Sequence, residues 1–303
     1  MYADDTKIMR TVTCDADRQL LQQDIDAITN WTQTWRLYLN TKKCKYMHIS
    51  SLQSEPRQYF MNESEPNGSN ERIELELTTS ERDLGVQISN DLKASAQATK
   101  ASSKANSVLG MLKRSFVSRD SELWKRLYMI YVRPHLEYAV AAWNPYLKKD
   151  IAALERIQHR ATKIPPSLKN LNYVQRCSAL KLTTLEQRRV RGDLIQHFKI
   201  SRDIDQVVWH SNQASVCTRD GHTKLIREKS KNCDQRFNFF TNRIVPNWHH
   251  LPNIVMQADT TNQFKERLDK WNEAGAVKRR RSRKSFHQHQ PSSAVAPDRS
   301  LET

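Results

Sequence analysis

The sequence predicts a mainly α-helical α+β fold with a small antiparallel β region near the N-terminus. Three observations lead to this prediction. The 303 residues include only 6 glycines, which is few for the tight turns of an all-β protein. Short alternating segments occur only before residue 90. Beyond it, the apolar residues recur every three or four positions, the period of an α-helix.

The first 90 residues predict one helix followed by short strands. Apolar residues recur at helical spacing over 24–39, and the polar run that begins at Asn40 interrupts this pattern. Further strands are predicted where apolar residues alternate with polar ones or where β-forming residues gather, over 44–49, 58–61, 73–77 and 84–88. Pro66-Asn67-Gly68 is a turn signal between the second and third of these strands.

Beyond residue 90, apolar faces predict helices over 105–116, 123–131, 151–164 and 184–200, and a shorter one around 264–271. The polar stretch 201–234 is expected to be a loop. The segment from Ala276 holds a basic run at 278–284 and little apolar content, so we expect it to be disordered. We therefore divide the chain into four regions, 1–90, 91–200, 201–275 and 276–303.

The charge balance predicts a polyanionic partner. Lysine and arginine number 49 against 33 acidic residues, a net charge of +16. Each cation that contacts a phosphate releases counterions and adds affinity, so nucleic acid is the favoured partner over an ordinary solvated basic surface. Candidate phosphate-binding residues occur on two predicted helices and are expected to point outward: Arg156, Arg160 and Lys163 on one, and Arg188, Arg189 and Arg191 on the other. Ordinary helix surface is the alternative for each of them.

Other classes of protein are disfavoured. The 5 cysteines are scattered and form no CxxC pair, which argues against a disulfide framework or a four-ligand zinc site and favours a reducing compartment. No stretch approaches the length of about 20 apolar residues that crosses a bilayer, and the N-terminus lacks a signal peptide. We expect a soluble intracellular protein without a membrane partner. The run 278–284 is a candidate nuclear-localisation signal, and a solvated tail is the alternative.

The tetrapeptide Tyr2-Ala3-Asp4-Asp5 is a candidate catalytic motif. Adjacent carboxylates at a tight turn between short strands can hold Mg²⁺ for phosphoryl transfer by a two-metal mechanism. Residues 6–9 are a plausible outgoing strand. Taken alone, a pair of solvated aspartates near a chain terminus is the simpler interpretation.

The tetrapeptide resembles the YxDD box of reverse transcriptases, in the YADD form of non-LTR (LINE-like) retrotransposon enzymes. Further boxes follow in the family's order: Leu39-Asn40-Thr41-Lys42-Lys43 is similar to its LNxxK motif and Asp83-Leu84-Gly85 to its LG box. Segments 132–139 and 239–252 resemble the helical region and the end of these enzymes. The resemblance runs from Tyr2 to about Trp271, and it implies a partial palm over 1–90 and a thumb-like region over 91–200.

The resemblance also implies residue roles. Asp4 and Asp5 would be catalytic and bind Mg²⁺, Lys43 would assist loss of pyrophosphate, and Leu84 with Gly85 would form the hairpin that grips the primer. An RNA template and a DNA primer would be the partners. The family's third metal-binding aspartate and its nucleotide-binding fingers would lie upstream of Met1. We therefore expect a C-terminal fragment that binds nucleic acid without polymerising.

Two alternatives stay open from the residues alone. The first is a non-catalytic helical nucleic-acid-binding protein, derived from a mobile element, in which the N-terminal box is inert. The second is a protein-interaction module built from the helices, whose binding would be indifferent to salt.

Overall fold

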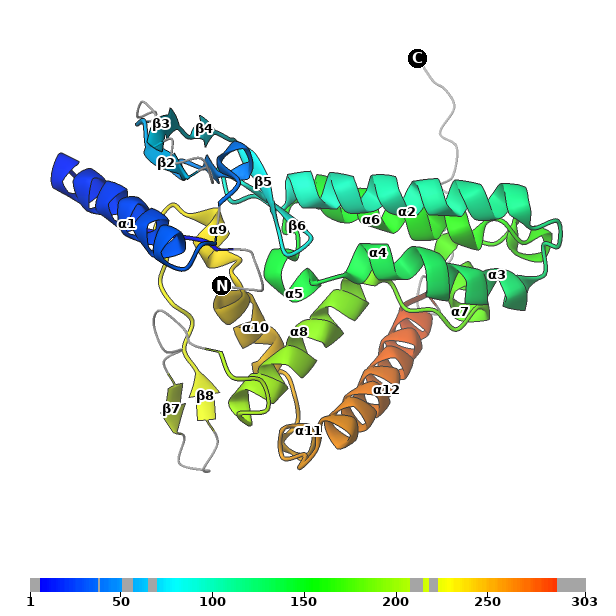
Figure 1. The fold of residues 1–303 in the computed structure, drawn as a ribbon. Coiled ribbons are helices and arrows are strands. Elements are labelled where there is room, and N and C mark those ends of the chain that lie inside the picture. Colours follow the sequence, from blue (N-terminus) through cyan, green and yellow to red (C-terminus); the bar gives the residue numbers. More distant parts are fainter. Residues whose placement is uncertain are drawn as a thin grey trace, which may run out of the picture. The chain divides into compact units, whose positions relative to one another are not determined.

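The computed structural model describes residues 6–37, 39–50, 57–64, 70–207, 215–217 and 223–287. The chain forms two compact units, Met1–Glu186 and Gln187–Thr303, each with its own apolar core. Their boundary falls inside helix α8 (Leu185–Ser201), where the sequence suggests a division at residue 200. The described chain is mainly helical, with short strand pairs concentrated near the N-terminus, which confirms the predicted fold class (Figure 1).

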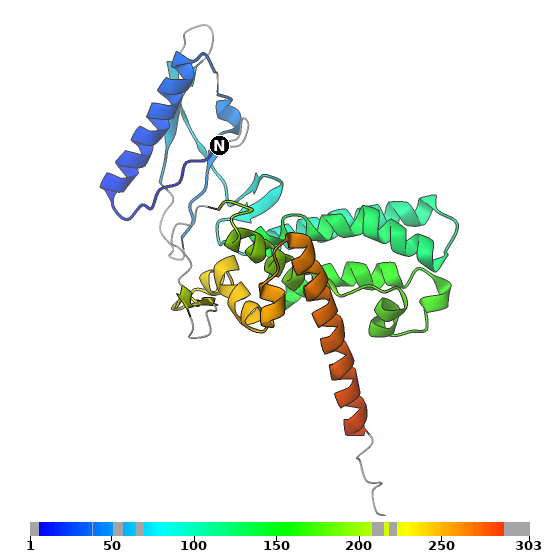
Figure 2. The same ribbon diagram turned by 90° about the horizontal axis from the view of Figure 1, so that it is seen from below.

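The N-terminal part of the first unit is a helix packed on a small β region (Figure 2). Its core consists of Ile25, Tyr59, Met61 and Leu75. The elements are α1 (Asp15–Thr34), the 3₁₀ turn η1 (Thr41–Lys43), β1 (Lys45–Tyr46), β2 (Phe60–Ser64), β3 (Asn70–Glu74) and β4 (Glu76–Leu77). Strands β2 and β3 pair antiparallel, whereas β1 pairs with β4 in parallel, which an antiparallel expectation did not include.

The strand that was expected over 44–49 forms only two residues of β1. The helix that was expected over 24–39 begins earlier and ends at Thr34. One side chain joins this helix to the sheet: the amide of Gln22 donates to the carbonyl of Phe60 at 2.7 Å and accepts from its N–H at 3.0 Å. These two hydrogen bonds satisfy the backbone N–H and carbonyl of Phe60, as a neighbouring strand would. They therefore fix the position of α1 along β2.

The rest of the first unit is a set of helices around one large core, followed in the chain by α8. The elements are the hairpin strands β5 (Ser80–Asp83) and β6 (Val86–Ser89), then α2 (Ser95–Ser115), α3 (Ser121–Leu127), the π-helical turn η2 (Tyr128–Val132), α4 (Arg133–Glu137), α5 (Val140–Trp143), α6 (Lys148–Thr162), the 3₁₀ turn η3 (Pro166–Leu168) and α7 (Tyr173–Ala179). Helix α2 faces this core with alanines and leucines, and α6 faces it with Leu154, Ile157 and Ala161. The predicted helices 105–116 and 151–164 are thereby confirmed.

Helices α2 and α6 lie side by side and run in the same direction (Figure 1). Near their first turns, the hydroxyl of Ser95 donates to the carboxylate of Asp150 at 2.6 Å. About three turns further along both helices, the guanidinium of Arg160 donates to the amide oxygen of Asn106 at 2.5 Å. Two contacts at matching intervals fix the parallel alignment.

The second unit packs α8 against the C-terminal helices. Its elements after α8 are β7 (Ser215–Cys217), β8 (Thr223–Leu225), α9 (Asp234–Phe237), α10 (Phe240–His249), α11 (Asn253–Met256) and α12 (Thr261–His287). Phe198 stacks on Phe264 with ring centroids 4.4 Å apart. Arg243 of α10 makes a bidentate pair with Asp193 of α8, at 2.9 and 2.8 Å.

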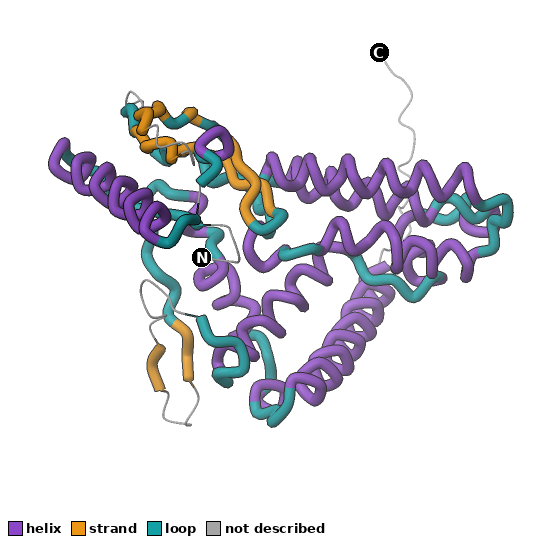
Figure 3. Tube along the Cα trace, in the orientation of Figure 1, coloured by secondary structure: helices purple, strands orange, loops and turns teal. Residues whose placement is uncertain are grey.

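One expectation for this unit is corrected. The stretch 201–234 is not a continuous loop, because it contains the β7–β8 hairpin (orange in Figure 3). The segment from Ala276, for which disorder is predicted, begins within α12, which ends at His287. Alanine, lysine and arginine are good helix formers, and 276–287 contains no proline to stop the helix. Residues 288–303 lie outside the described chain. None of the described helices combines the length and the apolar character that a membrane crossing requires.

Candidate nucleic-acid interface

Helices α2 and α6 carry exposed cations and few acids. We call eight of these cations together the α2–α6 face: Lys100, Lys104, Lys113, Arg114, Lys149, Arg156, Arg160 and Lys163. Those of α6 lie on one side of their helix, whereas Lys104 and Lys113 of α2 are nine residues apart and point to opposite sides. None of the eight cations pairs with a carboxylate of the described residues. The three sequence candidates from α6 thus share one exposed face as predicted. The four cations of α2 were missed, although an uninterrupted lack of acids over 95–115 is visible in the sequence.

The few acids near this face are used internally. Helix α2 contains no aspartate or glutamate, and α6 contains two acidic residues. Asp150 is 6% exposed and accepts the hydrogen bond from Ser95. Glu155 accepts hydrogen bonds from the hydroxyl of Tyr173 and from the backbone N–H of Leu185, at the start of α8. The surface that α2 and α6 present to solvent is therefore cationic or neutral throughout.

The spacing of the cations suits an extended polyanion. Lys100 to Arg114 on α2 and Lys149 to Lys163 on α6 each span about 21 Å at the rise of an α-helix. Phosphates along one duplex strand are spaced at about 3.4 Å, so this length faces about six of them. Across the seam between the helices, Ser95 contacts Asp150 and Asn106 contacts Arg160, and packed helices lie about 8–10 Å apart. The cations of α6, which share one side of their helix, can therefore contact one nucleic-acid backbone.

His159 lies beside the α2–α6 face and does not add to its charge. Its ring stacks on Tyr173, with centroids 3.4 Å apart. Partial burial lowers the pKa of His159, and the nearby positive charges of Arg176 and Lys163 lower it further. The neutral imidazole is therefore favoured at neutral pH.

The β5–β6 hairpin carries the predicted Leu84-Gly85 box at its turn. Asp83 pairs with Val86, so the turn has two residues, and both have positive φ, 44° for Leu84 and 86° for Gly85. Two-residue turns of this kind match the twist of the flanking strands and favour glycine. A Cβ on Gly85 would lie 3.1 Å from the ring of Tyr138. The glycine is therefore required both by its backbone conformation and by this close approach.

Tyr138 and α2 hold the hairpin in place. The hydroxyl of Tyr138 donates to the carbonyl of Leu84 at 2.9 Å. On the second strand, the N–H of Gln87 donates to the side chain of Gln97 at 2.8 Å, and Lys100 donates to the side chain of Gln87 at 2.9 Å. Lys100 belongs to the α2–α6 face, so the hairpin adjoins that face at the start of α2.

Segment 132–139 contains Tyr138 and positions it for its hydrogen bond to Leu84. Arg133 pairs with Glu137 along α4 at 3.8 Å, and Trp143 donates to the carbonyl of Tyr138 at 2.7 Å. Ala139 adopts a left-handed conformation with φ 50°, which turns the chain directly after Tyr138. Sequence reasoning missed Tyr138 as a site residue, because its partner Leu84 is 54 residues away.

The remaining candidates are the aspartates of the N-terminal motif, Lys43 and the arginines of α8. Asp4 and Asp5 lie outside the described residues, so the structure supplies no geometry for a Mg²⁺ site. Lys43 is exposed at the end of η1. Among the described residues, no group of three or more histidine, cysteine, aspartate or glutamate side chains is placed to hold a metal ion.

The α8 arginines were expected to point outward. This is wrong for Arg189, and Arg188 and Arg191 are only partly exposed. Arg189 is 2% exposed, because it lies four residues after the buried Leu185 and therefore on the same helix face. Arg191 makes a bidentate pair with Asp269 of α12, at 2.7 and 2.8 Å. Arg188 is half-buried. Arg189 and Arg191 therefore contribute to packing and ion pairing within the protein, and they are poor candidates for phosphate binding.

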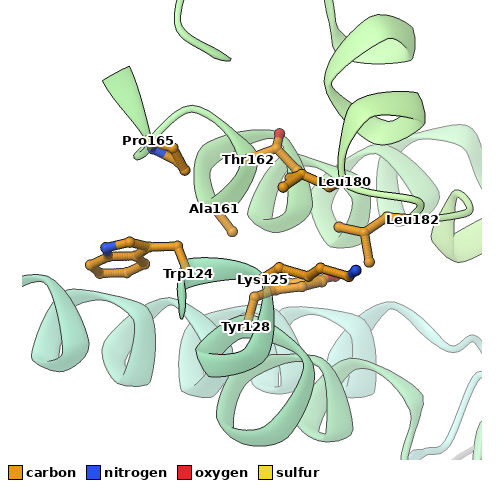
Figure 4. Close-up of a pocket in the computed structure, with 8 residues that line it drawn as sticks. All are labelled: Trp124, Lys125, Tyr128, Ala161, Thr162, Pro165, Leu180 and Leu182. Carbon is orange, nitrogen blue, oxygen red and sulfur yellow. The ribbon is translucent and has the colours of Figure 1, made fainter. Parts of the chain in front are cut away.

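The cavity shown in Figure 4 is too small for a substrate. It is lined by eight residues that include Trp124, Tyr128 and Leu180, and its volume of about 10 Å³ suffices for one water molecule at most. This cavity cannot hold a macromolecular ligand, whereas the cations of the α2–α6 face extend over about 21 Å along each helix. No protein-family model, curated protein or solved structure matches this chain.

Proposed function

We propose that this chain binds nucleic acid through phosphate contacts along the α2–α6 face. The observation that carries the proposal is the concentration of eight exposed cations on two parallel helices whose acids are buried or engaged. Helices α2 and α6 carry no phenylalanine, tyrosine or tryptophan. This face therefore offers cations for phosphates and no aromatic ring for stacking on bases, and we expect binding with little sequence preference.

Salt dependence provides the quantitative test. If the face neutralises about six phosphates, the logarithm of the association constant for a duplex falls with a slope of about −5 against the logarithm of salt concentration. Affinity then drops by roughly a thousandfold between 50 and 200 mM salt. Fluorescence anisotropy with a labelled duplex measures this slope.

A matched pair of triple variants locates the contacts. Arg156→Gln, Arg160→Gln and Lys163→Gln together remove three cations of the face. Arg126→Gln, Lys169→Gln and Lys181→Gln remove three exposed cations elsewhere in the same unit, with the same change in net charge. We expect the slope to fall by about 2.7 for the first variant and to stay near its original value for the second. An equal loss in both variants contradicts the assignment to this face.

We further propose that this nucleic-acid binding derives from a reverse transcriptase of the non-LTR type. The support is the order of the boxes in the sequence, together with the hydrogen bonds that join the Leu84-Gly85 turn to Tyr138 and its hairpin to Lys100. In such an enzyme Asp4 and Asp5 would hold Mg²⁺ during RNA-templated DNA synthesis. Primer extension on an RNA template tests this link: incorporation that Asp4→Asn abolishes supports an enzyme. Binding without incorporation, unchanged by Asp4→Asn, supports the non-catalytic alternative.

We also propose that the basic run 278–284 directs the protein to the nucleus. A fluorescent fusion in which these lysines and arginines are replaced by glutamine tests this point. Loss of nuclear enrichment is the expected result, and unchanged distribution contradicts it.

A further inference from the structure

The junction between α9 and α10 in the second unit exposes an aromatic ring that is already stacked with a cation. Phe237 is the last residue of α9 and is 43% exposed. The guanidinium carbon of Arg227 lies 3.6 Å from the centroid of its ring, and the same guanidinium donates to the Phe237 carbonyl at 3.3 Å. Arg227 covers one face of the ring, so a stacking ligand would have to approach from the other face.

A second ring of the same kind follows two residues later. Phe239, the N-cap of α10, is 40% exposed, and the guanidinium of Arg236 lies 5.5 Å from its centroid. Glu228 fixes Arg236 through an ion pair of 2.6 Å. Exposed Lys229 and Lys231 follow Glu228 in the chain.

This region is held in shape by a buried amide. Asn242, which is 1% exposed, donates to the carbonyl of Arg236 at 2.8 Å and accepts from the N–H of Glu228 at 2.9 Å. The segment that carries Arg227 and the segment that carries Phe237 are thus fixed to one another. A ring that is fixed before binding loses little conformational entropy when a ligand stacks on it.

The chemistry favours single-stranded nucleic acid as the ligand. An exposed aromatic ring stacks on any unpaired base, since every base has a π-face, while the bases of a duplex are already stacked on one another. Over residues 226–237 the chain carries four lysines and arginines and two acids, an excess of two positive charges that complements a phosphate backbone. An arginine beside the ring adds a cation that can also contact a phosphate or a base.

We propose that Phe237, backed by Arg227, is a base-stacking site for single-stranded nucleic acid, separate from the α2–α6 face. This site binds through the face of a base, whereas the α2–α6 face binds through phosphates. The inference does not depend on the proposed function, because the two sites use different chemistry and lie in different units.

The test uses the full chain and a single-stranded thymidine oligonucleotide that carries one 2-aminopurine. Stacking on a protein ring changes the fluorescence of 2-aminopurine, whereas a phosphate contact alone leaves it nearly unchanged. Phe237→Leu keeps an apolar side chain of similar size and removes the ring, and Phe237→Tyr restores a ring. We expect Phe237→Leu to weaken single-strand binding roughly tenfold and to abolish the fluorescence change. Phe237→Tyr should retain both.

The triple variant of α6 serves as the crossed control. It should lose duplex affinity while it retains the 2-aminopurine signal at a saturating concentration of oligonucleotide. Phe237→Leu should show the reverse pattern, with unchanged duplex affinity. The proposal is overturned if Phe237→Leu keeps the signal and the affinity of the wild type, or if Phe237→Tyr loses them as well. Failure of the α6 variant to affect duplex binding overturns the proposed function and leaves this site standing.

Discussion

Gly85→Ala is the sharpest test of how the β5–β6 hairpin is held. The alanine would have to adopt the φ of 86° that Gly85 has, and the left-handed region costs a residue with a Cβ about 1–2 kcal/mol. The added methyl would lie 3.1 Å from one ring carbon of Tyr138 and 3.3 Å from its hydroxyl oxygen. The ring must then move, which weakens a hydrogen bond to Leu84 worth about 1 kcal/mol. The expected loss of unfolding free energy is about 2–3 kcal/mol.

A double-mutant cycle separates the two contributions. In a Tyr138→Ala background the steric conflict and the hydrogen bond are both absent, so Gly85→Ala should cost only the backbone contribution of about 1–2 kcal/mol. Urea unfolding followed by tryptophan fluorescence measures the four free energies. Gly110→Ala is the control in the same unit: its Cβ would meet only a flexible arginine at 3.6 Å, and alanine stabilises a helix interior by up to about 1 kcal/mol. A Gly85→Ala cost that is identical in both backgrounds would refute the role that we assign to Tyr138.

Three further predictions concern buried polar groups. Burial lowers the pKa of His197 to about 4. Between pH 6.5 and about pH 4, this histidine is therefore protonated in the unfolded chain and neutral in the folded chain. Stability should be constant above pH 6.5 and lose up to about 3 kcal/mol on acidification to pH 4; in denaturant titrations across this range, His197→Gln should lack this component. Asp193→Ala leaves Arg243 without its bidentate partner and should cost about 3–5 kcal/mol, a loss that thermal unfolding at fixed pH would detect. Gln158→Leu removes the amide that joins Tyr128 to Tyr173 and should cost about 1–3 kcal/mol, whereas a stability equal to wild type would show that the tyrosine hydroxyls find other partners.

Helix positions could be predicted from the sequence because helical periodicity is a local property. The apolar residues of α2 and α6 lie on one stripe each, and the same stripes are buried in the structure. The strands were harder to predict, since their pairing is not local: β1 finds its partner β4 about thirty residues later and pairs in parallel. A segment in which polar and apolar residues alternate forms a strand only over the residues that pair with a neighbouring strand.

Burial on α1 shows why periodicity is not enough. The helical repeat includes Trp31 and Trp35, yet the structure leaves them 49% and 65% exposed. It buries Thr29 and Thr32 instead, whose hydroxyls donate to backbone carbonyls within the helix at 2.9 and 2.8 Å. A threonine that satisfies its hydroxyl locally presents a methyl group to the core, and hydrophobicity alone does not reveal this option.

The residues of the candidate site show the same difference between local and non-local features. Arg156, Arg160 and Lys163 could be assigned to a shared face because their spacing is local. Arg189 could not be assigned correctly, since its burial depends on what packs around α8. Tyr138 could not be predicted for the same reason, since its partner Leu84 is distant in the sequence.

The cationic character of the α2–α6 face depends on where the carboxylates go, and the count of cations alone does not determine it. Asp150 is held by Ser95 at the start of the helix pair, and Glu155 is turned toward Tyr173 and the N-terminus of α8. Both carboxylates thus act as internal connectors between helices. An acid at an exposed position of α6 would instead oppose the neighbouring arginines within a distance that salt screens only partly. Because Lys100 also anchors Gln87 of the hairpin, a strand bound along this face would reach the Leu84–Gly85 turn at the end where α2 begins. The same contacts that hold the fold together therefore leave the α2–α6 face without exposed carboxylates and place the hairpin beside Lys100.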